Sequence, residues 1–356
     1  MINDNSIPLY KKHEELTEFL YNNPGMLPHR YVFVLTTKCN LNCSFCNQVK
    51  SKKNNSLPPD QWINLTKQLP EYARVTITGG EPLIYRDFKK VFSYVAKRFT
   101  CNIITNGTLL TKELIDYVLS FPNFAILAIS IDNIGNTIRG LHQNQWKKLF
   151  SSIEYFHKQK NIIKSKCILD IKTMVLDQNS YNLFNIHKFC VEKFGCDTHG
   201  LQLLKGSPLQ HATVMYDAKN IFKHYKAPVY SNFEIIMKEL EKIREYTVNT
   251  GTKVFMHPKV LRFDSIEKLS NTDYVNSPDF IKNKFENCIY PWANVHINED
   301  GTLYPCLAVP MGNITRETLI KIINSDNFNN FRRIIKNEGI VLACNRCGWL
   351  KPKLHI

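Results

Sequence analysis

The sequence predicts an α/β fold in which a parallel sheet curves into a whole or partial barrel. Three observations lead to this prediction. Short β-rich runs alternate with longer amphipathic stretches from residue 30 to residue 204, and the unusual motifs directly follow the β-rich runs. The chain of 356 residues is also long enough to bury a large core. Such alternation favours parallel strands joined by right-handed helical crossovers.

Six segments are predicted as buried strands because they are short and rich in β-branched and other apolar residues. They are "RYVFVLTT" (30–37), "ARVTIT" (73–78), "CNIIT" (101–105), "FAILAISI" (124–131), "ILDIKTMV" (168–175) and "HGLQLL" (199–204). The segments between them have the apolar spacing of helices: "PPDQWINLTKQL", "YRDFKKVFSYVAKRF", "KELIDYVLS", "QWKKLFSSIEYFHKQ" and "YNLFNIHKFCVEKF". In a parallel barrel the loops after the strands carry the chemistry.

The chain after residue 204 departs from this alternation. "SNFEIIMKELEKIREY" predicts an amphipathic helix with Ile236, Leu240 and Ile243 on one stripe. "NVHINEDGTLYPC" predicts a hairpin that turns at "EDG". We therefore divide the chain into four parts: an N-terminal segment (1–29), a barrel (30–204), a helical region that shapes a substrate pocket (205–287) and a cysteine-rich extension (288–356).

Composition narrows the class of protein. Eleven cysteines, an odd number in clusters, favour metal binding in a reducing compartment over a disulfide framework. The N-terminus lacks a secretory signal and no apolar run reaches membrane-spanning length, so we expect a cytoplasmic protein without a membrane partner. The net charge of +15 is spread along the chain, which favours a solvated basic surface over a nucleic-acid site.

The first cysteine group follows the first predicted strand, in "TTKCNLNCSFCNQ". Cys39, Cys43 and Cys46 have the spacing C-x3-C-x2-C, so three sulfurs on one loop can converge on one metal cluster. A structural zinc ion would need a fourth ligand, and no His or Cys follows at finger spacing. Three thiolates on a four-iron cluster would leave one iron open.

With the aromatic Phe45 before the last cysteine, this spacing resembles the signature of radical S-adenosylmethionine (radical SAM) enzymes. The resemblance counts Phe45 among the cofactor contacts. "TGGEPL" resembles the glycine-rich element in which that family holds the cofactor's amino group, through backbone carbonyls and a glutamate carboxylate. The resemblance therefore assigns a cofactor contact to Gly79, Gly80, Glu81 and Pro82. Glycine permits close approach of the backbone, and a carboxylate accepts from an ammonium group.

The resemblance extends to two later strand ends and a following turn. "TNG", with Thr105, Asn106 and Gly107, and "SID", with Ser130 and Asp132, stand where the family contacts the ribose and methionine portions of the cofactor. Arg139 resembles the arginine that pairs with the methionine carboxylate, for which a fork of donors is suited.

The family resemblance implies the fold, the cofactors and the activity. It implies a partial (β/α)6 TIM-like barrel of the radical SAM type, a [4Fe–4S] cluster with three thiolate ligands, and S-adenosylmethionine (SAM). In this family one electron, from a donor such as flavodoxin or ferredoxin, leads to cleavage of SAM into methionine and a 5′-deoxyadenosyl radical. That radical abstracts a hydrogen atom from the substrate, and the protein positions and shields the reaction.

The second cysteine group lies near the end of the chain. Cys288, Cys306, Cys344 and Cys347 resemble the auxiliary-cluster extension called SPASM, in its shortened twitch form. The resemblance implies one auxiliary [4Fe–4S] cluster with four thiolate ligands and no open iron, which would transfer electrons or act as a structural clamp. A four-thiolate zinc site is the alternative on spacing alone.

The reaction is expected to be dehydrogenation or epimerisation of a small carbohydrate-like metabolite or of a ribosomal peptide. The alternatives are an RNA-modifying radical SAM enzyme and a non-enzymatic iron–sulfur or zinc scaffold. Only 29 residues precede the first predicted strand, which argues against a fused leader-binding domain but not against a separate one. No catalytic residue is assigned.

Two further sets of residues remain open. Candidate substrate contacts in the region after the barrel are Lys205, His211, His257, Lys259 and Arg262. The remaining thiols are expected to be buried, although one of them could donate a hydrogen atom to a substrate radical: Cys101, Cys167, Cys190 and Cys196.

Overall fold

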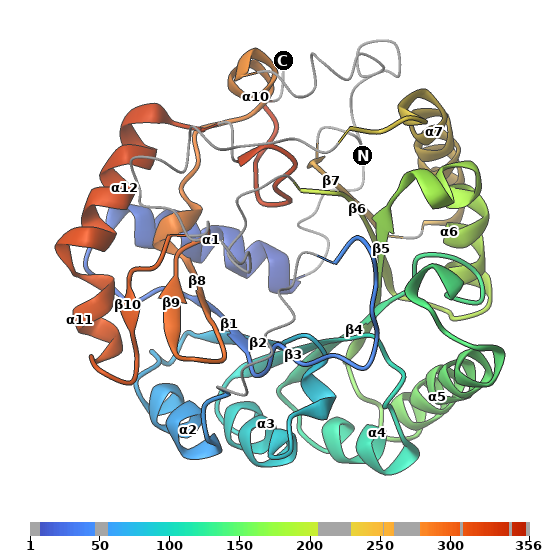
Figure 1. The fold of residues 1–356 in the computed structure, drawn as a ribbon, viewed down its shortest axis with the longest axis horizontal. Coiled ribbons are helices and arrows are strands. Elements are labelled where there is room, and N and C mark those ends of the chain that lie inside the picture. The colour runs from blue at the N-terminus through green and yellow to red at the C-terminus, as the bar shows by residue number, and fades with distance from the viewer. Residues whose placement is uncertain are drawn as a thin grey trace.

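The computed structural model describes residues 8–46, 56–205, 229–251, 253–259, 278–306, 309–341 and 344–353. Within these ranges, no helix combines the length and the apolar character needed to cross a bilayer. Figure 1 shows the helices that surround the sheet.

The predicted barrel is confirmed. Six strands lie side by side in sequence order, each parallel to the next: β1 (Arg30–Val34), β2 (Arg74–Thr78), β3 (Thr100–Thr105), β4 (Phe124–Ser130), β5 (Ile168–Val175) and β6 (Thr198–Leu203). They line the inside of a ring whose outside is formed by helices (Figure 1): α2 (Pro59–Lys67), α3 (Phe88–Ala96), α4 (Lys112–Leu119), α5 (Gln143–Ile162) and α6 (Leu183–Glu192).

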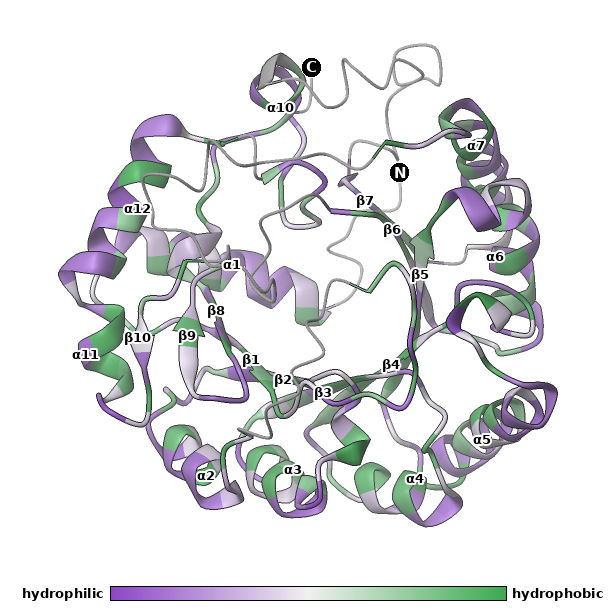
Figure 2. Cartoon of the chain, in the orientation of Figure 1, coloured by the Kyte–Doolittle hydropathy of each residue, from purple (hydrophilic) through white to green (hydrophobic). Residues whose placement is uncertain are grey.

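The alternation of side chains along each strand builds two environments. Tyr31 and Phe33 of β1 are fully buried under the outer helices, and the ring of Phe33 lies 5.0 Å from that of Trp62 on α2. Residues of the opposite face, such as Arg74 and Thr76 of β2, line the interior of the barrel. Figure 2 shows the apolar strands and the apolar helix faces that cover them. The main core therefore lies between sheet and helices, which leaves the interior free for polar groups.

The sheet continues beyond the six predicted strands at both edges. On one side β7 (Lys253–His257) pairs in parallel with β6. On the other side β8 (Asn294–Ile297) pairs in parallel with β1, and β9 (Thr302–Tyr304) and β10 (Gly312–Asn313) follow in antiparallel order. The predicted hairpin is confirmed as β8 and β9, and it joins the barrel sheet itself.

The other helices cover the ends and flanks of the barrel. The predicted amphipathic helix is confirmed as α7 (Phe233–Thr250), with Ile236, Leu240 and Ile243 fully buried. Helix α1 (Pro8–Asn22) lies across the ring in Figure 1 and lines its interior together with the starts of β1 and β2. The remaining helices lie toward the C-terminus: α10 (Pro278–Lys284), α11 (Leu319–Ile323) and α12 (Asp326–Glu338).

Candidate cofactor and substrate site

The loop that carries the first three cysteines is bound to the loop after β2. The amide of Gly80 donates to the carbonyl of Thr36 at 2.7 Å, and the amide of Glu81 donates to that of Lys38 at 2.8 Å. A Cβ atom on Gly79 would lie 2.7 Å from the Thr36 oxygen, and one on Gly80 would clash with the carbonyl oxygen of Lys38. The two glycines are therefore required by the contact between the loops.

The three cysteines of this loop face one pocket. Cys39, Cys43 and Cys46 line a cavity of about 170 Å³ together with residues from the ends of the next three strands. Burial raises the pKa of the Cys39 and Cys43 thiols, and the nearby Cys46 sulfur raises both further. The other lining residues are Thr37, Leu41, Thr78, Gly79, Gly80, Ile104, Thr105, Asn106, Ser130 and Arg139. Three converging sulfurs beside an open cavity fit a cluster that retains one free iron.

Glu81 lies behind the wall of this pocket. Its side chain is fully buried, and its carboxylate accepts hydrogen bonds from the Thr105 hydroxyl at 2.7 Å and the Asn106 amide at 2.8 Å. A third bond comes from the Leu83 amide at 3.1 Å. Burial raises the carboxyl pKa, while these hydrogen bonds oppose the rise. A carboxylate has about four acceptor sites, so the internal donors occupy most of its capacity.

Asn106 links the cysteine loop to the loop after β3. Its Nδ2 donates to Oδ1 of Asn40 at 2.9 Å and approaches the Cys39 sulfur at 3.8 Å. Its Oδ1 accepts from the amide and the hydroxyl of Thr108, at 2.9 and 2.6 Å. The side chain thus holds the cysteine loop, whereas the family resemblance implies a contact with the cofactor.

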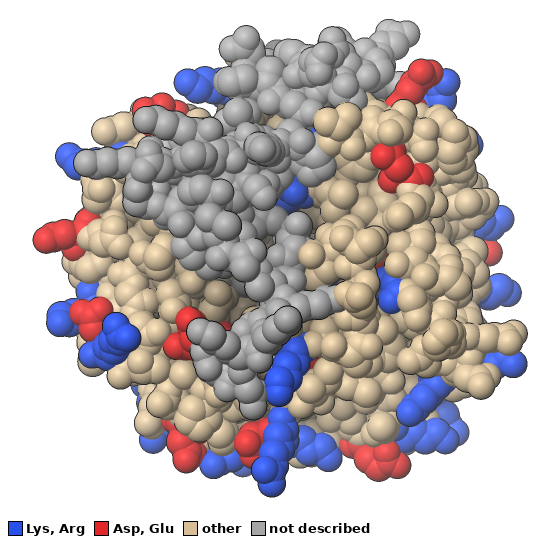
Figure 3. All heavy atoms as spheres, viewed as in Figure 1, with Lys and Arg blue, Asp and Glu red and all other residues tan. Residues whose placement is uncertain are grey.

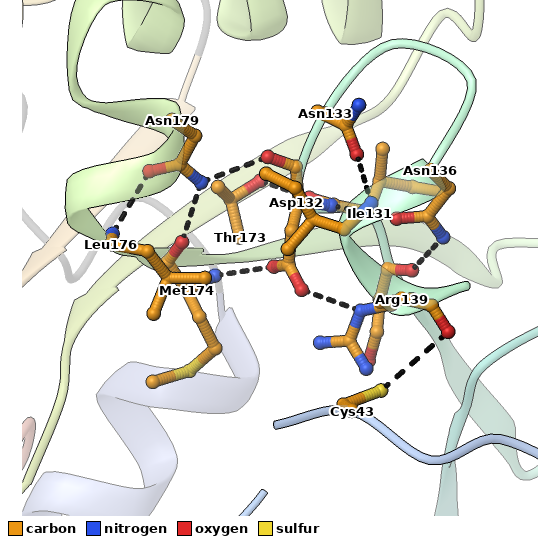
Figure 4. Close-up of polar contacts among 12 residues, drawn as sticks. Cys43, Ile131, Asp132, Asn133, Asn136, Arg139, Thr173, Met174, Leu176 and Asn179 are labelled. Carbon is orange, nitrogen blue, oxygen red and sulfur yellow. Dashed lines mark hydrogen bonds and ion pairs between the residues drawn. The ribbon is translucent and has the colours of Figure 1, made fainter. Parts of the chain in front are cut away.

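Arg139 and Asp132 form a buried ion pair beside the second cysteine (Figure 4). Nε of Arg139 lies 2.6 Å from Oδ2 of Asp132, whose Oδ1 accepts from the Met174 amide at 2.7 Å. The Arg139 guanidinium lies 5.3 Å from the ring centre of Phe45. The backbone oxygen of Arg139 accepts from the Cys43 thiol at 3.9 Å. Burial raises the pKa of Asp132, and the arginine opposes the rise. The pair fixes one edge of the guanidinium.

Of the predicted cofactor contacts, the structure brings six to the pocket and leaves five outside its wall. Gly79, Gly80, Thr105, Asn106, Ser130 and Arg139 line it. Phe45, Glu81, Pro82, Gly107 and Asp132 do not line it. Phe45 lies over the Arg139 guanidinium, and the two carboxylates position residues that line the pocket.

Two asparagines that the sequence reasoning missed hold the loop after β4. Asn136 donates to the Ser130 carbonyl at 3.1 Å and accepts from the Asp132 amide at 3.0 Å, with a left-handed φ of 50°. Asn179 donates to the carbonyls of Asp132 and Met174, both at 2.8 Å (Figure 4). Asparagine tolerates the left-handed region, which is the one local signal for Asn136. Asn179 has no such signal.

A chain of buried side chains lies behind the same loop. The Thr173 hydroxyl donates to the Ile131 carbonyl, so it accepts from Nε2 of His199 at 2.8 Å. A neutral His199 then accepts at Nδ1 from Nδ1 of His187, 2.9 Å away. Burial lowers the pKa of both imidazoles, and it lowers that of His187 to about 4. Both imidazoles are therefore neutral. The chain defines which nitrogen of each imidazole carries the proton.

A larger cavity of about 450 Å³ fills the barrel interior and shares Ile104, Ser130 and Arg139 with the cysteine pocket. It reaches from the loop after β4 to Arg30 and Arg74 at the starts of β1 and β2. Three of the candidate substrate contacts line it: Lys205, His257 and Lys259. His211 and Arg262 lie outside the described residues.

The four cysteines of the second group lie close together. Burial raises the pKa of the Cys288, Cys306 and Cys344 thiols, and neighbouring thiols of the same group raise each further. Backbone bonds hold the ligand loops: the Cys288 amide donates to Gly339 at 2.9 Å, and that of Cys347 to Cys344 at 3.0 Å. Four neighbouring thiols match the number of ligands of a fully ligated cluster. In the described ranges, no three His, Cys, Asp or Glu side chains form a site for a single metal ion.

Besides the pairing of β8 with β1, side-chain contacts connect the extension to the barrel. Arg346 lies between two of the cysteines and donates from Nη1 to the Leu204 carbonyl at 3.0 Å, and Gln202 of β6 donates to its carbonyl at 3.0 Å. At the β8–β9 turn, Glu299 accepts from the amide and hydroxyl of Thr37, each at 2.6 Å. The extension therefore contacts the first cysteine loop directly.

The other four thiols are buried, as predicted, and none of them lines the cysteine pocket or the barrel cavity. They are Cys101, Cys167, Cys190 and Cys196.

Comparison with known proteins finds a family model over each segment that contains a cysteine group. Residues 33–169 match the model of the radical SAM superfamily, and residues 288–348 match SPASM, an iron–sulfur cluster-binding domain. The chain is 33% identical over 136 residues to the sporulation killing factor maturation protein SkfB of Bacillus subtilis (strain 168), covering 35% of this chain and 33% of that protein. The second match favours iron–sulfur binding over zinc.

Two longer matches extend this likeness over most of the chain. It is 22% identical over 321 residues to the antilisterial bacteriocin subtilosin biosynthesis protein AlbA of the same strain, covering 85% of this chain and 61% of that protein. The chain thus spans one third of one relative and about three fifths of the other. The crystal structure of Streptococcus suis SuiB bound to precursor peptide SuiA matches with a TM-score of 0.64 and 15% identity, over 93% of this chain and 73% of that one. At this identity the likeness shows the fold.

Proposed function

The chain belongs to the radical SAM superfamily and carries a SPASM domain, and on this premise we propose that it is an enzyme that modifies a peptide. Its cofactors are a [4Fe–4S] cluster, SAM and an auxiliary iron–sulfur cluster. The peptide substrate is supported by two relatives, whose names assign them to sporulation killing factor maturation and bacteriocin biosynthesis. The solved relative SuiB is bound to a precursor peptide. These relatives favour a peptide over a carbohydrate-like metabolite.

We assign the cluster ligands from the two cysteine groups. Cys39, Cys43 and Cys46 would hold the cluster that leaves one iron open, because their sulfurs face the shared pocket. The auxiliary cluster would take all four thiols of the extension, so it cannot bind the substrate through an open iron. It would accept an electron from the substrate or clamp the extension. Its ligands are Cys288, Cys306, Cys344 and Cys347.

The observation that carries the proposal is the wall shared by the two cavities. Ser130 and Arg139 line both the cysteine pocket and the barrel cavity, so groups bound in the two spaces would meet there. When bound, the cluster and SAM supply a 5′-deoxyadenosyl radical that can abstract a substrate hydrogen. The protein's part is to orient both reactants and to exclude water from them.

Arg139 is the residue that orients the cofactor in this proposal. Asp132 holds its Nε, and no hydrogen-bond partner for its terminal nitrogens is found in the ranges that the structure describes. These donors can bind the methionine carboxylate. Glu81 and Asn106 act as positioning residues, since they fix the backbone around the pocket. The electron would come from an external donor such as flavodoxin or ferredoxin.

The charge distribution gives the RNA hypothesis no support on the visible face. Figure 3 shows basic side chains spread around the rim and interspersed with acidic ones. Proteins that bind RNA through their charge gather basic residues into a patch or stripe.

Product analysis tests the proposal. The anaerobically reconstituted enzyme is incubated with SAM, a reductant and short precursor peptides encoded beside its gene, and the peptides are analysed by mass spectrometry. Modification of a peptide with formation of 5′-deoxyadenosine is the expected result. Loss of two hydrogens would identify dehydrogenation or cross-linking, and an unchanged mass with altered stereochemistry would identify epimerisation. SAM cleavage that is stimulated only by sugars would contradict the proposal.

A further inference from the structure

Two arginines lie side by side at the starts of β1 and β2. Arg30 and Arg74 are directly opposite each other in the parallel register. Their strand neighbours Tyr31 and Val75 are fully buried on the helix-facing side, so both arginines face the barrel interior, where they line the large cavity. Arg74 is 3% exposed. Two positive charges thus lie deep in one cavity.

Among the residues that the structure describes, neither guanidinium has a hydrogen-bond or ion-pair partner. Nε and Nη1 of both arginines are buried without a hydrogen-bond partner, and no carboxylate in the described ranges lies within ion-pair distance. Two other cavity cations differ, because Lys172 pairs with Asp170 at 2.8 Å and Lys259 with Glu14 at 3.5 Å. Burial lowers the pKa of both guanidinium groups, and it lowers that of Arg30 to about 9. A buried, unpaired charge costs stability.

Among the described residues that line the cavity, the carboxylates Glu14 and Asp170 are already paired with lysines, and the Cys347 thiol adds negative charge near Arg30 without a hydrogen bond to it. The Arg30 guanidinium lies 5.1 Å from the ring centre of Trp349, and Tyr10 and His13 of α1 line the same end of the cavity. Burial lowers the pKa of His13 well below its usual value, so the imidazole stays neutral. The arginines also raise the cost of charging His13, which indicates how close these groups lie. The site offers donors and aromatic surface to an incoming anion.

We propose that Arg30 and Arg74 bind a carboxylate of the peptide substrate at the end of the cavity opposite the cysteine pocket. The inference rests on the proposed function, because a peptide carries carboxylates at its C-terminus and on Asp and Glu but carries no phosphate. A guanidinium matches the planar geometry of a carboxylate with two parallel donors. The carboxylate would supply the partner that both buried charges lack.

The length of β2 defines where the reaction would occur on such a peptide. Arg74 begins the strand, and Thr78 at its other end lines the cysteine pocket. At about 3.3 Å per residue, the two positions are about 13 Å apart. An extended peptide covers that distance in roughly four residues. The modified residue should therefore lie about four positions from the bound carboxylate.

Thermal unfolding of the anaerobically reconstituted protein tests this site without its substrate. Sodium acetate serves as the carboxylate probe, sodium chloride of equal ionic strength as the salt control, and inorganic phosphate as the competing anion. We expect a saturable rise in melting temperature with acetate. The Arg30→Met and Arg74→Met variants should lose that response and, without acetate, should melt no lower than the wild type. Arg98→Met, at an exposed arginine, should respond like the wild type.

Three results would overturn the inference. Acetate could have no effect beyond that of chloride, phosphate could stabilise more strongly than acetate, or both variants could melt well below the wild type, as structural arginines would. The wild-type titration stands by itself if a variant does not fold. Deoxyadenosine formation by the wild-type enzyme is measured in parallel. Failure of that assay would contradict the proposed function, whereas failure of the acetate titration alone would contradict only the carboxylate site.

Discussion

Single residues in the pocket owe their positions to partners that do not face it. Arg139 is the clearest case, because Asp132 holds its Nε and Phe45 lies against its guanidinium. Asp132 is itself held by the Met174 amide. The position of Arg139 is therefore set by Asp132 in the loop after β4, by Met174 of β5 and by Phe45 of the cysteine loop.

Replacing Arg139 by Lys should weaken SAM binding. Lysine keeps the positive charge but loses the fork that can hold Asp132 and a carboxylate together. We expect about a tenfold rise in the SAM dissociation constant, roughly 1.4 kcal/mol, with an unchanged cluster absorption spectrum. Anaerobic titration calorimetry measures it, with Arg98→Lys as the exposed control. A dissociation constant within twofold of the wild type would remove Arg139 from the site.

Replacing Gly80 by Ala should disrupt the first cluster alone. The added Cβ would overlap the Lys38 carbonyl and lie 2.5 Å from that of Thr37, so the cysteine loop would have to move. We expect iron content to fall from about eight to about four per chain, because none of the four cysteines of the second site lies on the loops of this contact. Gly200→Ala is the matched control, since its Cβ would meet nothing closer than 3.7 Å. Full iron content in Gly80→Ala would contradict this role.

At the scale of elements, the β8–β9 hairpin supports the first cysteine loop. Glu299 at its turn accepts from the amide and hydroxyl of Thr37 and from the hydroxyl of Ser56 at 2.9 Å. Glu299 is 6% exposed. Because Thr37 lies two residues before Cys39, the extension helps to set the start of the ligand loop.

The Glu299→Gln variant should be less stable and slower in SAM cleavage. The amide retains one acceptor oxygen and places an NH2 group among three donors. We expect a loss of about 1–3 kcal/mol in the free energy of unfolding, measured by urea titration. Glu234→Gln, at an exposed glutamate of α7, is the control. Equal stability of the two variants would show that the hairpin contact contributes little.

The histidine chain under β4 and β5 should make the protein sensitive to acid. Burial lowers the pKa of His187 to about 4, so between about pH 4 and 6.5 the unfolded chain binds a proton that the folded chain does not. Stability from this residue is complete above pH 6.5 and falls as the pH drops through that window. From pH 7.5 to pH 5 the loss is about 2 kcal/mol.

Urea titrations at those two pH values test this prediction. In His187→Gln the loss of unfolding free energy between pH 7.5 and pH 5 should be about 2 kcal/mol smaller than in the wild type. His142→Gln, at an exposed histidine, should keep the wild-type loss. An identical pH dependence in all three proteins would contradict the assignment.

At the scale of the whole molecule, the barrel and the extension form one continuous sheet around a polar interior. β8 pairs with β1, and Arg346 binds the carbonyl that follows β6. Helix α1 lines the cavity together with the starts of β1 and β2. The same connections place both cysteine groups on the barrel. Ligand loops on a shared rigid sheet suit an enzyme that must fix two cofactors relative to one substrate.

The sequence predicts those parts of this architecture that depend on local pattern. The six strands, their helices and α7 follow from apolar spacing, and the cysteine triplet from its own spacing. The pairing of β8 with β1 joins segments more than 250 residues apart, and no local pattern encodes it. β7 carries only three apolar residues in a polar context and was not predicted.

The same limit applies to the site. Gly79, Gly80 and Arg139 could be predicted as cofactor contacts because they lie in motifs that follow one another in the order typical of the family. The residues that hold them in place could not be predicted. Asn179 reaches Asp132 from 47 positions away, and its contact depends on how β5 lies against β4. Arg30 and Arg74 did carry a signal, a charge at the start of each of two buried strands, which the sequence reasoning did not use.

Deoxyadenosine formation by the triple variant Cys39→Ala, Cys43→Ala, Cys46→Ala tests the central claim most directly. The anaerobically reconstituted variant is compared with the wild type and with Cys101→Ala, a buried thiol outside both groups. We predict that SAM cleavage is abolished in the triple variant while about four irons per chain remain at the second site, and that Cys101→Ala retains cleavage. Continued formation of 5′-deoxyadenosine by the triple variant would contradict the claim.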